Sequence, residues 1–170
     1  GLISVLMLAL TAGLTVRILG LRTRAGVVVA SALLVTFPSV ACIFSYLFTA
    51  DAYFIALFFS ALSVYCAKFC RRGWIAAVAL LTVACGTYQA FVCYAIGLFL
   101  FDCLLTLLEG APLPQVVRKG LAYVGICVAS LALYYLILQV LLAVTGTALE
   151  TYQGMSGMSL SNLGAFLAEI

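Results

Sequence analysis

Residues 74–108 decide the fold, and they read WIAAVALLTVACGTYQAFVCYAIGLFLFDCLLTLL. A single helix of this length would extend about 50 Å at 1.5 Å per residue, whereas the hydrocarbon core of a membrane is roughly 30 Å thick. Near its middle the run contains one polar break, Gly86-Thr87-Tyr88-Gln89. We therefore predict that the run forms two membrane-spanning helices joined at this break.

The composition of the whole chain is that of a membrane protein. Apolar residues make up 67% of the sequence and charged residues only 8%. A soluble domain carries roughly a quarter charged residues, so this chain cannot cover itself with a surface compatible with water. Because apolar stretches recur along its length, we predict an all-α, polytopic transmembrane helical bundle rather than a soluble domain on one anchor.

The remaining apolar runs supply the other crossings, and they cover residues 2–19, 25–65 and 120–144. The run 25–65 breaks at Pro38-Ser39 and at Thr49-Ala50-Asp51, so it also divides into two crossings. The first run has the length of a signal peptide. It lacks a basic N-terminal region and more spans follow it, so we predict a membrane span there. The total is about six crossings.

Two polar stretches are predicted to be loops. Residues 112–119 contain two prolines and two basic residues, and residues 145–162 are rich in Gly, Ser and Thr. We interpret residues 1–170 as a single transmembrane domain that is a segment of a longer chain. The reasons are that it starts with Gly1 rather than Met and ends inside an apolar run.

The basic residues test the number of crossings. All eight fall in three groups, at 17–24, 68–72 and 118–119. Basic residues in short loops stay on the cytoplasmic side of a membrane. Six crossings place the three groups on one side, whereas a single helix over 74–108 would move the third group across. The charges therefore favour six crossings, with Asp51, Tyr88, Gln89 and the 145–162 loop outside.

Asp51 is the first candidate functional residue. It stands between two predicted spans, in Phe48-Thr49-Ala50-Asp51-Ala52-Tyr53. A carboxylate at membrane depth costs about 2.5 to 3.5 kcal/mol on insertion scales, so it usually lies at a cavity or an interface. An alternative interpretation is that Asp51 only caps a helix starting at Ala52, where Asp is a favoured N-cap. The two roles are compatible.

Further binding candidates are predicted on the same side as Asp51. Tyr88 and Gln89 could hydrogen-bond a polar ligand such as a sugar; alternatively, Tyr88 belongs to an interfacial aromatic belt and Gln89 only satisfies the turn. Glu150 lies in the 145–162 loop and is included as a binding candidate, although a polar residue in a loop needs no special explanation. At the opposite end, Asp102 and Glu109 are predicted to be interfacial and to pair with loop cations.

The sequence also excludes several kinds of site. It has seven cysteines, no histidine and no C-x-x-C pair, so no zinc site is expected and the cysteines are predicted to be free thiols. It contains no phosphate-binding Gly-rich loop with Lys, no Ser–His arrangement and no closely spaced pair of carboxylates. No metal, named cofactor or nucleic acid is predicted as a ligand.

Two motifs resemble a known family. The first motif is Phe37-Pro38-Ser39-Val40 followed by residues 46–53. The second is Gly86-Thr87-Tyr88-Gln89-Ala90 followed by Ala95-Ile96-Gly97-Leu98. Both are similar to segments of the Gtr-type membrane glucosyltransferases that modify bacterial O-antigens. The similarity runs from about residue 3 to residue 145.

This resemblance implies a GT-C-like integral membrane enzyme. Such enzymes take a sugar from a polyprenyl-phosphate donor and pass it to a surface glycan on the outer face of the bacterial cytoplasmic membrane. It implies Asp51 as the catalytic candidate and Tyr53, Tyr88 and Gln89 as binding candidates. Members of the wider class place a catalytic carboxylate in the first outer loop. No acidic pair precedes Asp51 here, so the resemblance also implies a site completed outside this segment.

Two other function classes remain open from the residues alone. A transporter or flippase bundle usually places polar groups near the bilayer midplane. The predicted midspan regions here carry almost no charge and the polar candidates gather at one face, which favours interfacial chemistry. A purely structural membrane subunit is the third possibility.

Overall fold

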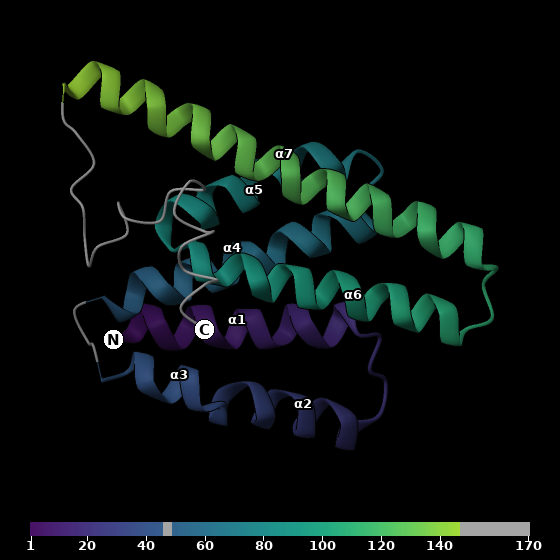
Figure 1. Cartoon of the computed structure of the whole chain (residues 1–170). Coiled ribbons are helices and arrows are strands. Elements are labelled where there is room, and N and C mark those ends of the chain that lie inside the picture. The colour runs from purple at the N-terminus through teal and green to yellow at the C-terminus, as the bar shows by residue number, and fades with distance from the viewer. Residues whose placement is uncertain (46–48, 147–170) are drawn as a thin grey trace, which may run out of the picture. The chain divides into compact units, whose positions relative to one another are not determined.

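The computed structural model describes residues 1–45 and 49–146, and this part of the chain is helical without strands. The elements are α1 (Leu2–Ile18), α2 (Arg24–Thr36), α3 (Pro38–Ile43), α4 (Ala50–Phe69), α5 (Gly73–Thr87), the 3-10 turn η1 (Gln89–Phe91), α6 (Val92–Leu108) and α7 (Leu113–Thr145) (Figure 1). The predicted all-α class is confirmed.

The chain divides into two compact units, Gly1–Tyr135 and Leu136–Ile170. The sites and contacts described below all belong to the first unit. Of the second unit, only the last turns of α7 and Gly146 fall within the described residues. The predicted loop at 145–162 therefore lies almost wholly outside them.

Three helical segments are long and apolar enough to cross a membrane by themselves, namely α4, residues Gln89–Leu108 and α7. The other apolar helices, α1, α2 and α5, have between 10 and 17 residues each. The described part of this helical membrane protein thus has six main apolar segments, at the positions of the six predicted spans. Three of the six are long enough to cross a membrane alone.

The three predicted breaks are present. α5 ends at Thr87, and the extended backbone of its C-cap residue Tyr88 (φ −161°, ψ 109°) stops the helix before η1 and α6 begin. α2 ends at Thr36, because the next residue, Phe37, precedes a proline and therefore disfavours the helical region. Pro38 then opens α3, where its missing N–H leaves no helical hydrogen bond unmade. α4 begins at Ala50, within the third break. The long runs therefore divide where polar or proline residues interrupt them.

The prediction of a loop at 112–119 is wrong for most of its length, because α7 begins at Leu113. Pro114 is tolerated there, since the first turn of a helix has no partner for its backbone N–H groups. Lys119, on the second turn, is held by groups on α6 that the sequence does not place next to it. This tertiary contact supports the part of α7 that precedes its apolar run.

The turn between α4 and α5 brings two backbones into direct contact at Gly73. A Cβ atom at this position would lie 1.7 Å from the carbonyl oxygen of Cys66 and 3.0 Å from the Cβ of Cys70. No side chain fits in that space, and Gly73 is buried. The close return of α5 along α4 therefore depends on a glycine at the first position of α5.

Four polar side chains, here called the α7 polar stripe, lie along one face of α7: Lys119, Tyr123, Ser130 and Tyr134. Within the stripe, the Ser130 hydroxyl donates to the Ile126 carbonyl of its own helix at 2.7 Å and also lies 3.3 Å from the Val78 carbonyl oxygen on α5. The Thr82 hydroxyl likewise donates to the Val78 carbonyl at 2.8 Å and lies 3.2 Å from the Ser130 carbonyl oxygen. These two hydroxyls bring α7 and α5 into polar contact near the middle of the helices.

Candidate functional site

The helices run in alternating directions, so the chemistry-bearing residues separate to two ends of the first unit (Figure 1). At one end, Asp51 at the start of α4 contacts the start of α1, and Tyr53 contacts Tyr88 after α5. At the other end, Lys68 near the end of α4 donates to the Ile18 carbonyl at the end of α1. All eight basic residues lie at this second end of the unit, in its turns and near the ends of its helices. It is here called the basic end.

Asp51 is held through one of its two carboxylate oxygens. Its Oδ1 accepts hydrogen bonds from the Ser4 backbone nitrogen at 3.0 Å, from the Ser4 hydroxyl, and from the Gly1 nitrogen at 3.0 Å. Over residues 1–45 and 49–146, Oδ2 has no hydrogen-bond partner, and the side chain is 42% exposed. The carboxylate is therefore anchored on one side and open on the other.

The interpretation of Asp51 as the cap of its own helix is wrong. α4 begins at Ala50 with Thr49 at the N-cap, so Asp51 lies within the first turn. Its hydrogen bonds go across to the first turn of α1 instead. An acidic side chain near the first turns of two helices is favoured by both helix dipoles. This contact fixes where the carboxylate points.

Tyr53 and Tyr88 come together in an aromatic group. Their ring centroids lie 4.5 Å apart at an interplanar angle of 61°, and the Tyr88 ring lies 5.5 Å from that of Phe91. Tyr88 is 42% exposed. Side chains two positions apart on a helix project in nearly opposite directions. Tyr53 therefore does not share the side of α4 that carries Asp51. The structure places these candidates at the same end without direct contact between the carboxylate and the rings.

Gln89 joins the same end to α7. Its side-chain amide donates to the Tyr134 hydroxyl at 3.0 Å, and Gln89 itself is exposed. Its carbonyl oxygen and second N–H remain able to meet a ligand. Glu150, the remaining predicted candidate, lies outside the described residues.

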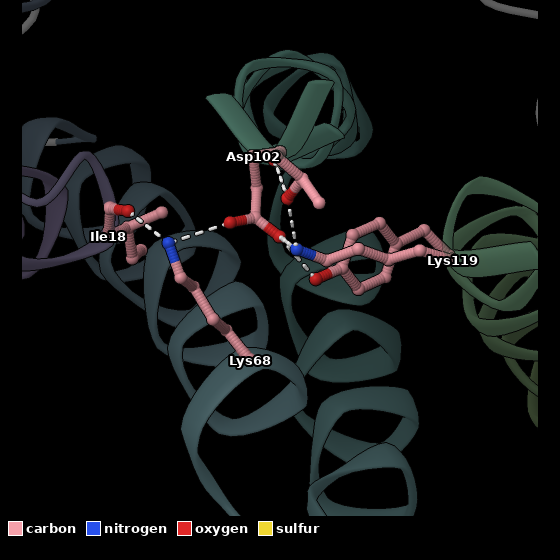
Figure 2. A network of polar contacts seen from close by, with 6 residues as sticks. Ile18, Lys68, Asp102 and Lys119 are labelled. Carbon is pink, nitrogen blue, oxygen red and sulfur yellow. Dashed lines mark hydrogen bonds and ion pairs between the residues drawn. The ribbon is translucent and has the colours of Figure 1, made fainter. Parts of the chain in front are cut away.

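A second polar cluster lies at the basic end around Asp102 (Figure 2). Asp102 is on α6 and is only 1% exposed. Its Oδ1 pairs with the Lys68 ammonium at 2.6 Å, and its Oδ2 pairs with the Lys119 ammonium at 2.5 Å. The Tyr123 hydroxyl donates to Oδ2 at 2.6 Å. Both oxygens of this carboxylate are occupied.

The cations of this cluster also bind other groups. Lys68 donates to the Ile18 carbonyl at 2.6 Å, and Lys119 donates to the Thr106 hydroxyl at 2.8 Å. The cluster thereby joins α1, α4, α6 and α7, and Figure 2 shows the two ammonium groups converging on Asp102 from different helices. The predicted pairing of Asp102 with basic residues is confirmed, although Lys68 and Lys119 lie on α4 and α7 rather than in loops. Glu109 forms no ion pair in residues 1–45 and 49–146. The sequence places the Asp102 carboxylate at the interface, whereas the structure buries it.

A pocket of about 450 Å³ lies beside this cluster. Its lining residues come from α4, α6 and α7 and from the α1–α2 and α6–α7 turns: Leu19, Gly20, Arg22, Lys68, Asp102, Leu105, Thr106, Glu109 and Lys119. Sequence reasoning did not find this pocket. The one available signal is that Asp102 is the sole acidic residue within the apolar helix α6.

The cysteines and the acidic residues form no metal centre in the part of the chain that the structure describes. All seven cysteines are free, as predicted, and no three potential ligands among His, Cys, Asp and Glu come together in residues 1–45 and 49–146.

A family model described as Glucosyl transferase GtrII matches residues 1–169. The chain belongs to this family. No curated protein and no solved structure matches the chain. The resemblance seen in the Phe37–Val40 and Gly86–Ala90 segments is thus confirmed over almost the whole chain, and in general terms the protein is a membrane glucosyltransferase. Family membership favours this class over a transporter or flippase bundle.

In a GtrII family member, the two carboxylates differ in what they could do. A general base needs an oxygen within hydrogen-bond reach of the proton that it removes. Asp102 has both oxygens engaged by two ammonium groups and a phenol, so it is suited to holding helices together. Asp51 has one oxygen without a hydrogen-bond partner in residues 1–45 and 49–146, and it lies at the same end of the unit as Tyr88 and Gln89. The Asp51 end is therefore the better candidate for chemistry on a sugar.

Proposed function

We propose that this chain transfers a glucosyl group from a polyprenyl-phosphate-linked donor to a cell-surface glycan, and that the reaction takes place at the Asp51 end. The observation that carries the proposal is the carboxylate of Asp51, whose Oδ1 is fixed by Ser4 and whose Oδ2 has no hydrogen-bond partner among the residues that the structure describes. Membership of the GtrII family supports the sugar class. The donor, the acceptor and the location of the reaction are our proposal.

The proposed step is a displacement at the anomeric carbon of the donor glucose. An acceptor hydroxyl oxygen forms a bond to that carbon, while the bond from the carbon to the phosphate oxygen breaks and the phosphate keeps the electron pair. The proton of the acceptor hydroxyl passes to Asp51 Oδ2. A carboxylate with one oxygen fixed is preorganised for this transfer, because its orientation does not have to be found during the reaction.

The neighbouring polar and aromatic residues would bind the sugars. The exposed face of Tyr88 offers a flat apolar surface and a hydroxyl, Tyr53 supports its ring, and Gln89 retains one free N–H and a carbonyl oxygen. Glu150 stays a binding candidate beyond the described residues. Because the eight Lys and Arg residues lie at the basic end, hydroxyl and amide groups of this chain would face the donor phosphate.

We further propose that the Asp51 end faces the outside of a bacterial cytoplasmic membrane. The basis is the gathering of all Lys and Arg side chains at the other end, since short basic loops stay in the cytoplasm. A cysteine-free version with one cysteine at position 88 is expected to react with a membrane-impermeant thiol reagent added to intact cells. A version with its cysteine at position 71 should react only after the cells are opened. Labelling in the reverse order would refute the orientation.

Replacing Asp51 with asparagine tests the proposed reaction. Asn keeps the shape and can still accept from Ser4, but it cannot take a proton at neutral pH. We expect glucosyl transfer in isolated membranes to fall about 100-fold, at the lower end of general-base contributions, with unchanged protein abundance. The matched control is Glu109→Gln, which neutralises an exposed carboxylate at the basic end. Unchanged transfer by the Asp51 variant at normal abundance would remove Asp51 from the mechanism.

A further inference from the structure

A polar pocket at the basic end adjoins an apolar groove, which runs between α6 and α7 from there toward the other end of the unit. From their chemistry, we propose that together they bind one anionic phospholipid, with its phosphate in the pocket and an acyl chain along the groove. This inference is independent of the transfer reaction at the Asp51 end, because no residue is shared between the two.

The pocket offers cationic donors that are still available to a ligand. An ammonium group has three N–H donors. Lys68 uses two of them on Asp102 and Ile18, and Lys119 uses two on Asp102 and Thr106. Each lysine thus keeps one donor for a phosphate oxygen.

Arg22 adds a guanidinium group that can bind phosphate in a bidentate manner. It lines the pocket, is exposed, and makes no ion pair with any carboxylate in the described residues. Glu109 is the one carboxylate of the lining that forms no ion pair there, and it opposes an anion. Three cations against two carboxylates leave the lining positive, and the remaining basic residues lie at the same end of the unit.

The groove has a volume of about 240 Å³ and an almost wholly apolar lining. It is formed by one face each of α6 and α7: Ile96, Phe99, Leu100, Cys103, Gly120, Tyr123, Val124, Cys127, Val128 and Leu131. From Gly120 to Leu131 it follows α7 for about 16 Å at 1.5 Å per residue. Glycine at position 120 leaves room there, since a Cβ atom would meet only the Cys103 sulfur at 3.8 Å. An extended hydrocarbon chain fits this shape and chemistry.

The pocket and the groove adjoin on both helices. Cys103 and Gly120, which line the groove, directly follow Asp102 and Lys119, which line the pocket. Tyr123 belongs to the boundary, because its hydroxyl donates to Asp102 while its ring lines the groove. A soluble phosphate would use only the polar half of this arrangement. Basic pockets between transmembrane helices are sites where phospholipid headgroups bind, which favours a lipid.

The test measures lipid binding to the purified chain in detergent by native mass spectrometry, with phosphatidylglycerol and phosphatidylcholine as probes. We expect at least fivefold tighter binding of phosphatidylglycerol. The Arg22→Gln variant should bind it about fivefold more weakly, which corresponds to the loss of about 1 kcal/mol for one basic residue. Arg118→Gln is the matched control, because Arg118 is exposed at the same end and does not line the pocket; its binding should not change.

A second variant and a competitor separate the lipid from a free anion. Gly120→Leu fills the groove and should weaken phosphatidylglycerol binding, while millimolar inorganic phosphate should not displace the lipid. Equal binding of the two lipids would overturn the proposal, as would an Arg118→Gln effect as large as that of Arg22→Gln. Displacement by phosphate together with unchanged binding by the Gly120 variant would also overturn it, in favour of a soluble anion.

Discussion

Replacing Asp102 with asparagine is expected to lower the free energy of unfolding by about 3 kcal/mol. The carboxylate is buried and neutralises two ammonium groups, and its loss would leave Lys68 and Lys119 facing one another without a counter-charge. Removing one partner of a buried ion pair costs about 3 to 5 kcal/mol. The lysine side chains are 23% and 29% exposed, so water relieves part of the repulsion and places the effect at the lower end.

Denaturant or thermal unfolding in detergent micelles would measure this difference. Glu109→Gln is again the matched control, since it removes an exposed carboxylate at the same end and should change stability by less than about 0.5 kcal/mol. Adding Lys68→Met to the Asp102 variant should recover part of the loss, because one of the two unpaired cations is then absent. Equal stability of the Asp102 and Glu109 variants would show that the cluster does not hold the helices.

Replacing Gly73 with alanine is expected to destabilise the α4–α5 hairpin by about 3 kcal/mol, at the upper end of the cost of overpacking. The added methyl group would overlap the Cys66 carbonyl, which is backbone and cannot move without shifting the end of α4. The expected observation is a lower unfolding midpoint and a reduced yield of monodisperse protein.

Gly125→Ala on α7 is the matched control for this substitution. Nothing lies within 4 Å of a Cβ atom at that position, and alanine favours a helix over glycine by about 1 kcal/mol. This variant should be as stable as the parent or more so. If the Gly73 and Gly125 variants unfold at the same midpoint, the tight turn between α4 and α5 does not depend on the missing side chain.

The fold could be predicted from the sequence because membrane thickness limits helix length. The run 74–108 is too long for one crossing and has one polar break, and in the structure α5 ends at Thr87 within that break. The start of α7 was missed because polarity and proline at 112–119 indicate a loop. In the structure this stretch is a helix supported from α6 through Lys119 and Thr106, a contact that no local pattern contains.

The candidate sites show the same division between local and long-range information. The sequence places Asp51, Tyr88 and Gln89 at one end, because alternation of spans decides it. It does not reveal that the Asp51 carboxylate binds Ser4, 47 residues away, or that Gln89 binds Tyr134. For Asp102 the sequence predicts cationic partners but not the burial of the carboxylate. That burial depends on α4, α6 and α7 coming together, which involves residues far apart in the sequence.

The α7 polar stripe has a mechanical consequence. Tyr134 accepts a hydrogen bond from Gln89 at the Asp51 end, Ser130 contacts the Val78 carbonyl of α5 near the middle, and Lys119 pairs with Asp102 at the basic end. Lys119 and Tyr134 are separated by about 22 Å of helix at 1.5 Å per residue. Sliding α7 by even one residue would misalign all three attachments at once. This part of α7 therefore sets the distance between the Asp51 end and the basic end.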